Sequence, residues 1–283
     1  MGIGGNFRSE NFPQMRRYYT DYFPYEWVEW FLTLGGKFPL NQREFGFCWA
    51  GGDIVKRNQD FKSKEDAQLY MDMNGYPDDE VAMGTMIPLR FGSMDALKTF
   101  LVSKQPHAID IGPIYQSIAH ASSDRKDPYA PKLSALQFDI DVKDYEPSCE
   151  CYKKKRLCDL CWIQYLRPAL RELIKFLRDK MLFDSSGIIP VFSAGAGFHV
   201  FVIHERVWAW DNVARQALIK HLPSAVKCDP AVTLGHLIKL PFSPHKSNGH
   251  LSLPILDIEA FLPSQWRVKI EDVDYDLMEK LTL

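Results

Sequence analysis

Residues 136–142 read Leu-Gln-Phe-Asp-Ile-Asp-Val, an alternation of apolar and polar side chains that is typical of a β-strand with one buried face. Asp139 and Asp141 are two positions apart, so both carboxylates point to one face of such a strand and the apolar side chains point to the other. Two neighbouring carboxylates repel each other unless a cation lies between them, and Mg²⁺ or Mn²⁺ prefers carboxylate oxygen. The stretch predicts a buried strand that presents a divalent-metal site.

A chance origin for this pair stays open, because the chain contains 36 acidic residues. Asp272, Asp274 and Asp276 repeat the spacing near the C-terminus, but this triplet lacks the glycine of a calcium loop and lies in a polar helical stretch. We expect the triplet to be a solvated face. The Asp139 pair differs because it ends an apolar strand.

The surrounding sequence predicts an α/β core in which strands alternate with helices. Apolar runs predict buried strands at Ala108–Tyr115, at 133–142 and at 188–203, the last interrupted by a small-residue turn at 194–197. Helical spacing predicts helices at 15–34 with a break at Pro24, at 63–74, at 93–104 with Ser93 as N-cap, at 162–182 and at 208–221. A hairpin is expected at 43–56, and short strands are expected at 236–240 and 251–258.

Composition indicates a globular protein, with 283 residues, 46% hydrophobic and 25% charged. We expect one domain over residues 1–283, with a small zinc-binding insertion at 145–165. No apolar run is long enough to cross a bilayer, and the first residues do not resemble a secretory signal, so an intracellular location is expected. The net charge is −2, so a nucleic-acid partner would have to bind a local basic face.

Four of the six cysteines form a cluster, which we call the cysteine knuckle: Cys149, Cys151, Cys158 and Cys161. Thiolates at such spacings can complete the tetrahedral shell of a structural Zn²⁺, although unliganded or redox thiols remain alternatives. The basic run 153–156 is compatible with a nuclear-localisation cluster, a phosphate contact or a solvated loop. Cys48 and Cys228 stand alone and are expected to be core thiols.

A second group of residues suits a triphosphate with bound metal. The run Ser193-Ala-Gly-Ala-Gly-Phe-His199 places small residues between two apolar strands, which lets backbone N–H groups approach phosphate oxygens. Lys239 and His245 follow a third carboxylate, Asp229. Each element alone has an ordinary structural interpretation, and only the combination indicates a nucleotide site.

When these motifs are considered together, the chain resembles the small, catalytic subunit of archaeo-eukaryotic DNA primase. The runs that carry the resemblance follow the family's order over most of the chain: 22–25 (Tyr-Phe-Pro-Tyr), 42–45 (Gln-Arg-Glu-Phe), 109–112 (Ile-Asp-Ile-Gly), 138–141 (Phe-Asp-Ile-Asp) with 144–145 (Asp-Tyr), the cysteine knuckle ending in Cys161-Trp162, and 239–245 (Lys-Leu-Pro-Phe-Ser-Pro-His). The chain departs from the family at two places. Gly195 and Ala196 stand where relatives commonly carry a basic pair, and Ala108 stands where relatives usually carry a basic residue. The stretch between His199 and Asp229 is also short, so the family's helical insertion is expected to be reduced.

The resemblance implies an α/β (α+β) primase core with an RRM-like mixed sheet, surrounding helices and a zinc-binding knuckle. It implies the following roles: Asp139, Asp141 and Asp229 as catalytic carboxylates that hold Mg²⁺ or Mn²⁺, and Arg43, Ser193, His199, Lys239 and His245 as nucleotide-binding residues. The implied activity is two-metal synthesis of short RNA primers on single-stranded DNA from nucleoside triphosphates. Implied partners are a primase large subunit in a heterodimer and a replicative polymerase, with a nuclear location in eukaryotes.

Two alternatives remain open. The first is a primase-polymerase that uses deoxynucleotides in repair or in a mobile element. The second is a non-catalytic, zinc-bearing subunit that binds nucleic acid.

Overall fold

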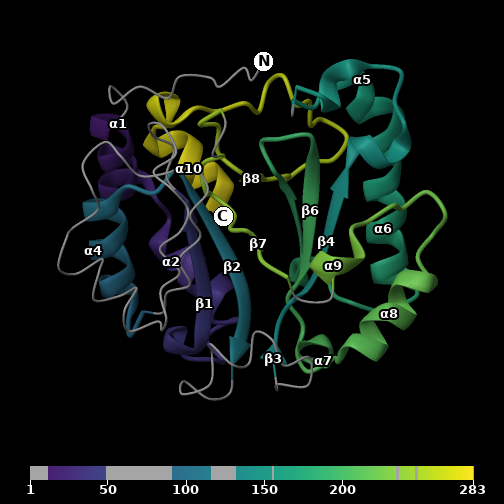
Figure 1. Ribbon diagram of the computed structural model, residues 1–283, viewed down its shortest axis with the longest axis horizontal. Coiled ribbons are helices and arrows are strands. Elements are labelled where there is room, and N and C mark those ends of the chain that lie inside the picture. Colours follow the sequence, from purple (N-terminus) through teal and green to yellow (C-terminus); the bar gives the residue numbers. More distant parts are fainter. Residues whose placement is uncertain are drawn as a thin grey trace, which may run out of the picture.

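Two antiparallel β-sheets of four strands each organise the residues described by the structure, a computed structural model (Figure 1). These residues are 12–48, 91–115, 132–154, 156–233, 236–245 and 248–282. The expected second half of the hairpin at 43–56 and the helix expected at 63–74 lie outside them. Helices pack around both sheets, which confirms the expected α/β fold.

The first sheet is built around β2 (Ala108–Tyr115), whose bounds match the predicted strand. It pairs with β1 (Arg43–Cys48), β3 (Lys132–Leu133) and β7 (Ile238–Lys239). Cross-strand pairing places Asp110 opposite Lys239. The register therefore places the lysine predicted to bind nucleotide beside β2, on a strand that pairs with β2 alone among the described strands.

Aromatic helices cover the first sheet, as their apolar spacing predicted. They are α1 (Phe12–Arg17), the π-helical turn η2 (Tyr18–Tyr22), α2 (Tyr25–Leu32), α4 (Met94–Lys104) and α10 (Tyr275–Thr282). Pro24 separates the first helices, and Ser93 caps α4 by accepting a hydrogen bond from the Ala96 amide. The buried Tyr18 hydroxyl donates to the carbonyl of Phe242 at 2.7 Å, which ties these helices to the loop after β7.

The second sheet has the order β4-β6-β5-β8, formed by β4 (Leu136–Asp141), β5 (Ile188–Phe192), β6 (Gly197–Val202) and β8 (Leu253–Pro254). Behind it lie α5 (Asp159–Cys161), the π-helical turn η7 (Trp162–Leu166) and α6 (Arg167–Asp179), so the amphipathic helix expected at 162–182 is present (Figure 1). Strand β8 is shorter than the strand expected at 251–258.

Alternating side chains of the second sheet face two different cores. Phe138, Ile140, Phe198 and Val200 pack with the buried leucines of α6. Phe201, on the opposite face, packs with the helices and strands of the first sheet. Because Asp139 and Asp141 alternate with the α6-facing residues, their carboxylates point toward the first sheet.

The strand predicted at 133–142 is two strands in two sheets, and this corrects the expectation of one. Arg215 explains the break, because its buried guanidinium donates to the carbonyls of Ser134 and Ala135 at 3.1 and 3.3 Å. A carbonyl bound to this side chain is withdrawn from the strand ladder. The chain therefore crosses from one sheet to the other just before the paired aspartates.

The helix predicted at 208–221 is also divided, into α7 (Glu205–Trp208) and α8 (Asn212–Lys220). Helix α8 begins after Asp211 because the side chain of Asp211 caps it by accepting a hydrogen bond from the Ala214 amide at 2.8 Å. The remaining elements are short: η3 (Leu40–Gln42), η5 (Val142–Tyr145), η6 (Glu150–Tyr152), η8 (Ser185–Gly187), α9 (Pro230–Thr233) and η9 (Ile270–Asp272).

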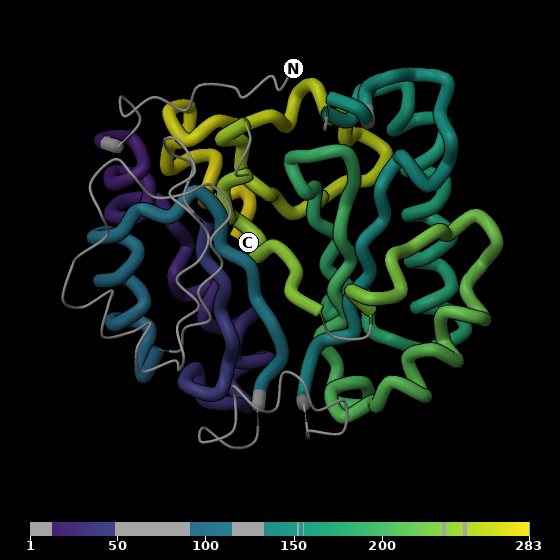
Figure 2. Tube along the Cα trace, viewed as in Figure 1, coloured from purple at the N-terminus to yellow at the C-terminus, as the bar shows by residue number. Residues whose placement is uncertain are grey.

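The C-terminal segment connects both halves of the molecule. Figure 2 shows this segment, in yellow, running between the teal region of α5 and the purple region of α1. At one end Ser264 donates to the carboxylate of Asp159, and at the other the rings of Tyr22 and Tyr275 are 4.9 Å apart. In the described part of the chain, no helix is long and apolar enough to span a membrane.

Candidate functional site

Two of the three expected catalytic carboxylates lie at the end of β4, and the backbone of the third residue, Asp229, is bonded to the same strand. Asp139 and Asp141 lie on its face toward the first sheet, opposite the fully buried Phe138 and Ile140. Asp229 comes from the start of α9, and its backbone N–H donates to the carbonyl of Asp139 at 2.9 Å. The side chain of Asp229 also accepts a hydrogen bond from the Ala231 amide at 2.8 Å. Tertiary packing thus places the third carboxylate beside the pair.

The carboxylate of Asp139 is buried and lies near other negative charges, and both conditions raise its pKa. Burial, followed by the negative charges of Asp141 and Asp229, raises the pKa of Asp139 from 3.8 to about 6, although Lys143 opposes the shift. A divalent cation would reverse this effect, because it favours the ionised forms of the carboxylates around it. The arrangement suits a metal site built from oxygen ligands.

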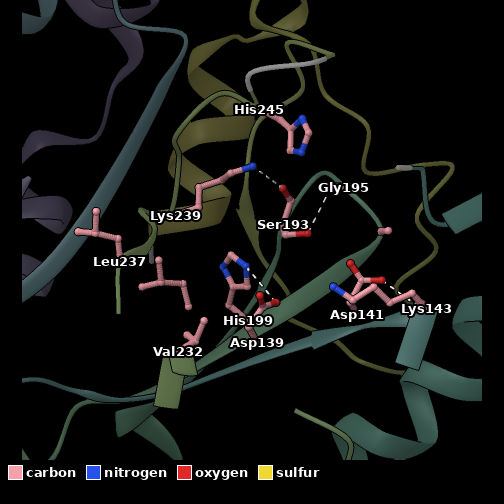
Figure 3. A pocket seen from close by; sticks show the side chains of 12 residues that line it. Asp139, Asp141, Lys143, Ser193, Gly195, His199, Val232, Leu237, Lys239 and His245 are labelled. Atoms are coloured by element: carbon pink, nitrogen blue, oxygen red, sulfur yellow. Dashed lines mark hydrogen bonds and ion pairs between the residues drawn. The ribbon is translucent and has the colours of Figure 1, made fainter. Parts of the chain in front are cut away.

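A cavity of about 340 Å³ opens beside Asp139 and Asp141, between the two sheets (Figure 3). Four of the five residues predicted to bind nucleotide contribute to its lining, and the fifth, Arg43, does not. The lining residues are Asp139, Asp141, Lys143, Ser193, Gly195, Ala196, His199, Val232, Leu237, Ile238, Lys239 and His245. Strands β4, β6 and β7 and the turn between β5 and β6 therefore build one site.

The turn between β5 and β6 forms one wall of the cavity. Ala194 adopts φ +60°, and the Oγ of Ser193 donates to the carbonyl of Gly197 at 2.9 Å, which holds the turn closed. A Cβ atom at Gly197 would lie 2.1 Å from the carbonyl oxygen of Ile140, so only glycine permits this approach to β4. The small residues that the sequence places here serve close backbone packing.

Lys239 and His245 approach this turn from the other side. The Nζ of Lys239 donates to the carbonyl of Ser193 at 3.1 Å. A Cβ atom at Gly195 would lie 3.1 Å from the Nε2 of His245, so the imidazole occupies the space beside that glycine. Figure 3 shows both side chains projecting into the cavity above the carboxylates.

His199 faces Asp139 from the neighbouring strand, and the two residues are cross-strand partners. The Nε2 of His199 lies 3.5 Å from the Oδ1 of Asp139, and the ring is 6% exposed. Burial, with a further contribution from the charge of Lys239, lowers the pKa of His199 to about 3. His199 is therefore neutral at pH 7, and its contact with Asp139 is not an ion pair.

Arg43 occupies a structural position away from the cavity. Its buried guanidinium donates to the carbonyl of Leu32 at 2.6 and 2.9 Å and to that of Gly112 at 2.9 Å. These bonds join α2 to β1 and β2. The sequence predicted Arg43 to be a nucleotide-binding residue, but Arg43 is not among the residues that line the cavity.

The structure adds Lys143 to the cavity, a residue that the sequence interpretation did not single out. Lys143 lies two positions after Asp141 in η5, and its backbone N–H donates to the Oδ1 of Asp141 at 2.9 Å. The only sequence signal was its place directly after the aspartate pair. Surface lysines are common, so this signal was weak.

The four sulfur atoms of the cysteine knuckle lie within 4.8 Å of one another, and the Sγ atoms of Cys149 and Cys158 are 3.7 Å apart. The edge of a tetrahedral shell with Zn–S bonds of about 2.3 Å is about 3.8 Å, so the spacing fits. Burial raises the pKa of the Cys161 thiol, and a bound cation would reverse this by favouring the thiolate. The cluster could hold a metal ion such as zinc.

The cysteine knuckle is joined directly to the cavity wall. The backbone N–H of Leu157, between the two cysteine pairs, donates to the carbonyl of Gly195 at 3.0 Å. Arg267 donates to the carbonyl of the same Leu157. On the other side of the turn, the side-chain amide of Asn248 donates to the carbonyl of Ala194 at 2.9 Å. The turn is therefore held by segments far apart in the sequence.

The raised pKa of Asp139 predicts how stability depends on pH without added Mg²⁺ or Mn²⁺. Between about pH 4 and 6 the folded chain binds the Asp139 proton more tightly than the unfolded chain, so this group's contribution to stability falls as pH rises through that window. We expect the melting temperature of Asp139→Asn to exceed that of the wild type by a margin that grows from pH 4.5 to 7. Calorimetry across this range measures the margin.

The control for this experiment is Asp272→Asn, an exposed aspartate at the end of η9. Its melting temperature should follow the wild-type profile. A margin for Asp139→Asn that is independent of pH would contradict the assignment of the raised pKa to Asp139.

Comparisons with known proteins find similarity over the part of the chain that forms this site. The family model of the DNA primase small subunit matches residues 138–233. The DNA primase small subunit of Schizosaccharomyces pombe is 29% identical over 66% of this chain and 39% of that protein. The Caenorhabditis elegans counterpart is 26% identical over 72% of this chain and 42% of that protein. The chain thus spans about two fifths of the length of these relatives.

Among solved structures, the polymerase domain of Mycobacterium tuberculosis ligase D in complex with DNA matches 93% of this chain and 92% of that chain, with a TM-score of 0.46 and 13% identity. The family match begins at the strand of the paired aspartates and ends in α9, just after Asp229. The family resemblance inferred from the sequence is confirmed: the chain is similar to DNA primase small subunits over much of its length, and their family model matches residues 138–233.

Proposed function

We propose that the chain is a nucleotidyltransferase that synthesises short RNA primers on a single-stranded DNA template. The observation that supports this most directly is a cavity lined by Asp139 and Asp141 together with Lys239 and His245, with Asp229 bonded through its backbone to Asp139. Carboxylates on one side and cationic or hydrogen-bonding groups on the other suit a metal-bound triphosphate. The similarity to DNA primase small subunits supports the same activity.

In the proposed reaction, Asp139, Asp141 and Asp229 hold two divalent ions, Mg²⁺ or Mn²⁺. Such ions lower the pKa of a 3′-hydroxyl and neutralise charge on the triphosphate. The 3′-hydroxyl would release its proton to water, its oxygen would bond to the α-phosphorus of the incoming nucleotide, and the bond from that phosphorus to pyrophosphate would break. Lys239 and His245 bind and orient the phosphates, and their contribution is electrostatic.

His199 has a different part in this proposal. It is neutral at pH 7 and so has a single N–H, which can donate either to the carboxylate of Asp139 or to a phosphate oxygen of bound nucleotide. Ser193 closes the turn that lines the phosphate side of the cavity. Arg43 stabilises the contact between α2 and the first sheet and has no proposed contact with nucleotide.

We further propose that the cysteine knuckle holds a structural Zn²⁺. All four positions of a tetrahedral shell would be filled by sulfur, so no position would be open for catalysis. The similar proteins are DNA primase small subunits, which supports a heterodimer with a primase large subunit. We also propose association with a replicative polymerase. A nuclear location follows if the source is eukaryotic.

The test is a primer-synthesis assay on unprimed single-stranded DNA, with ribonucleoside triphosphates and with Mg²⁺, Mn²⁺ or neither. We expect short RNA products that require both the template and a divalent ion. Deoxynucleotide products in place of RNA would identify a primase-polymerase. Nucleic-acid binding without turnover, unaffected by substitution of Asp139 and Asp141, would identify a non-catalytic subunit and refute the proposal.

A further inference from the structure

The cavity has few side chains available to meet the negative charge of a triphosphate. Lys239 already donates to the carbonyl of Ser193. His199 is buried against Asp139. Arg43 binds backbone carbonyls outside the cavity lining. Among the residues expected to bind nucleotide, Lys239 is therefore the only one that brings a full positive charge to the cavity.

The turn that closes the phosphate side of the cavity brings no charge of its own. Gly195 and Ala196 both line the cavity, and neither has a polar side chain. A side chain at position 195 would begin 3.1 Å from the Nε2 of His245, so the imidazole would have to move to admit one. A cation for this side of the cavity has to come from another segment.

Lys143 provides such a cation. It follows β4 directly, lines the cavity, and lies beside Asp141 (Figure 3). The bond from its backbone N–H to the Oδ1 of Asp141, 2.9 Å, fixes its backbone relative to the carboxylates. Its position is therefore set by the same strand that sets the proposed metal ligands.

The ammonium group of Lys143 has no hydrogen-bond or ion-pair partner among the residues that the structure describes. Other lysines nearby are engaged: Lys227 donates to the carbonyl of Asp144 at 2.8 Å, and Lys153 pairs with Glu150 at 2.7 Å. A lysine whose role was to neutralise the carboxylates would be expected to contact one of them. The charge of Lys143 acts on Asp139 and Asp144, but no hydrogen bond or ion pair joins its ammonium group to either carboxylate in the part of the chain that the structure describes.

We infer that Lys143 is a nucleotide-binding residue that contacts the triphosphate of the incoming nucleotide, opposite Lys239. This inference rests on the proposed function and extends it to a residue outside the expected set. A lysine binds phosphate as a flexible point charge and needs no fixed geometry, which suits an exposed side chain at a cavity edge. Lys143 of η5 and Lys239 of β7 would then hold the phosphates between them.

The test compares Lys143→Gln, Lys143→Arg and the matched control Lys175→Gln in the full chain. Lys175 is an exposed lysine of α6, the helix that covers the face of the second sheet away from the cavity. Binding of adenosine triphosphate and adenosine monophosphate with Mg²⁺ is measured by calorimetry, and the KM and kcat of primer synthesis are measured in parallel.

Lys143→Gln is expected to weaken triphosphate binding and raise KM about tenfold, the effect of one charge-assisted hydrogen bond. Monophosphate binding, kcat and the melting temperature should change little. Lys143→Arg should retain most of the affinity, and Lys175→Gln should match the wild type. Triphosphate affinity equal to the wild type in Lys143→Gln would overturn the inference, as would equal weakening for both nucleotides.

The outcomes also separate this inference from the proposed function. A wild-type chain that makes primers, with an unchanged KM in Lys143→Gln, refutes only the role of Lys143. A wild-type chain that binds triphosphate through Lys143 but makes no product refutes only the proposed function.

Discussion

Asp139→Asn is expected to lower the rate of primer synthesis by about a thousandfold or more, since loss of a metal ligand removes several kcal/mol of charge stabilisation in the transition state. Asparagine keeps the size of the side chain but not its charge. The negative charges of Asp141 and Asp229 both act on Asp139 and raise its pKa. Single-turnover rates with saturating Mg²⁺ or Mn²⁺ measure the effect.

The control is Asp272→Asn, the same substitution in the exposed C-terminal aspartate group, which should leave the rate unchanged. Because Asp139→Asn removes repulsion, the variant should fold and should still bind template. Wild-type activity in Asp139→Asn, with either metal, would show that the reaction does not use this carboxylate.

Cys161→Ser is expected to remove the metal of the cysteine knuckle and to lower the free energy of unfolding by at least about 4 kcal/mol, because the binding energy of a structural metal is folding energy. Cys161 is buried within the knuckle, and its Sγ lies 3.5 Å from that of Cys151. Loss of the knuckle also releases the bond from Leu157 to Gly195. We therefore expect nucleotide affinity to fall together with stability.

Elemental analysis of the purified chain should find one Zn²⁺ per wild-type molecule and less in Cys161→Ser, and denaturant unfolding measures the stability. Cys48→Ala is the control, since Cys48 is a buried thiol on β1, away from the knuckle. That variant should keep its metal. Full metal content and unchanged stability in Cys161→Ser would rule out the proposed zinc site.

Several elements could be read from local sequence because neighbouring residues determine them. The bounds of β2 follow from one apolar run, and the cap at Ser93 follows from one side chain and one amide. The prediction failed at 133–142, where a single strand was expected. Arg215, which lies far along the chain, binds the carbonyls at the break, and no local pattern contains that contact.

The candidate site shows the same limit. Spacing along one strand was sufficient to place Asp139 and Asp141 on one face, and short spacing was sufficient to group the thiols of the cysteine knuckle. Asp229, in contrast, comes to the pair through a backbone hydrogen bond to Asp139. No local pattern in the sequence around Asp229 predicts that bond.

The sequence by itself determined which residues can form the strand of the paired aspartates and which thiols can share a metal, because alternation and short spacing act within a few residues. Only the tertiary structure decided which side chains share the cavity. It directs Arg43 to the carbonyls of Leu32 and Gly112 and places Lys143 at the cavity edge. The physical reason is that a buried guanidinium must satisfy its donors with the acceptors that the fold brings within reach.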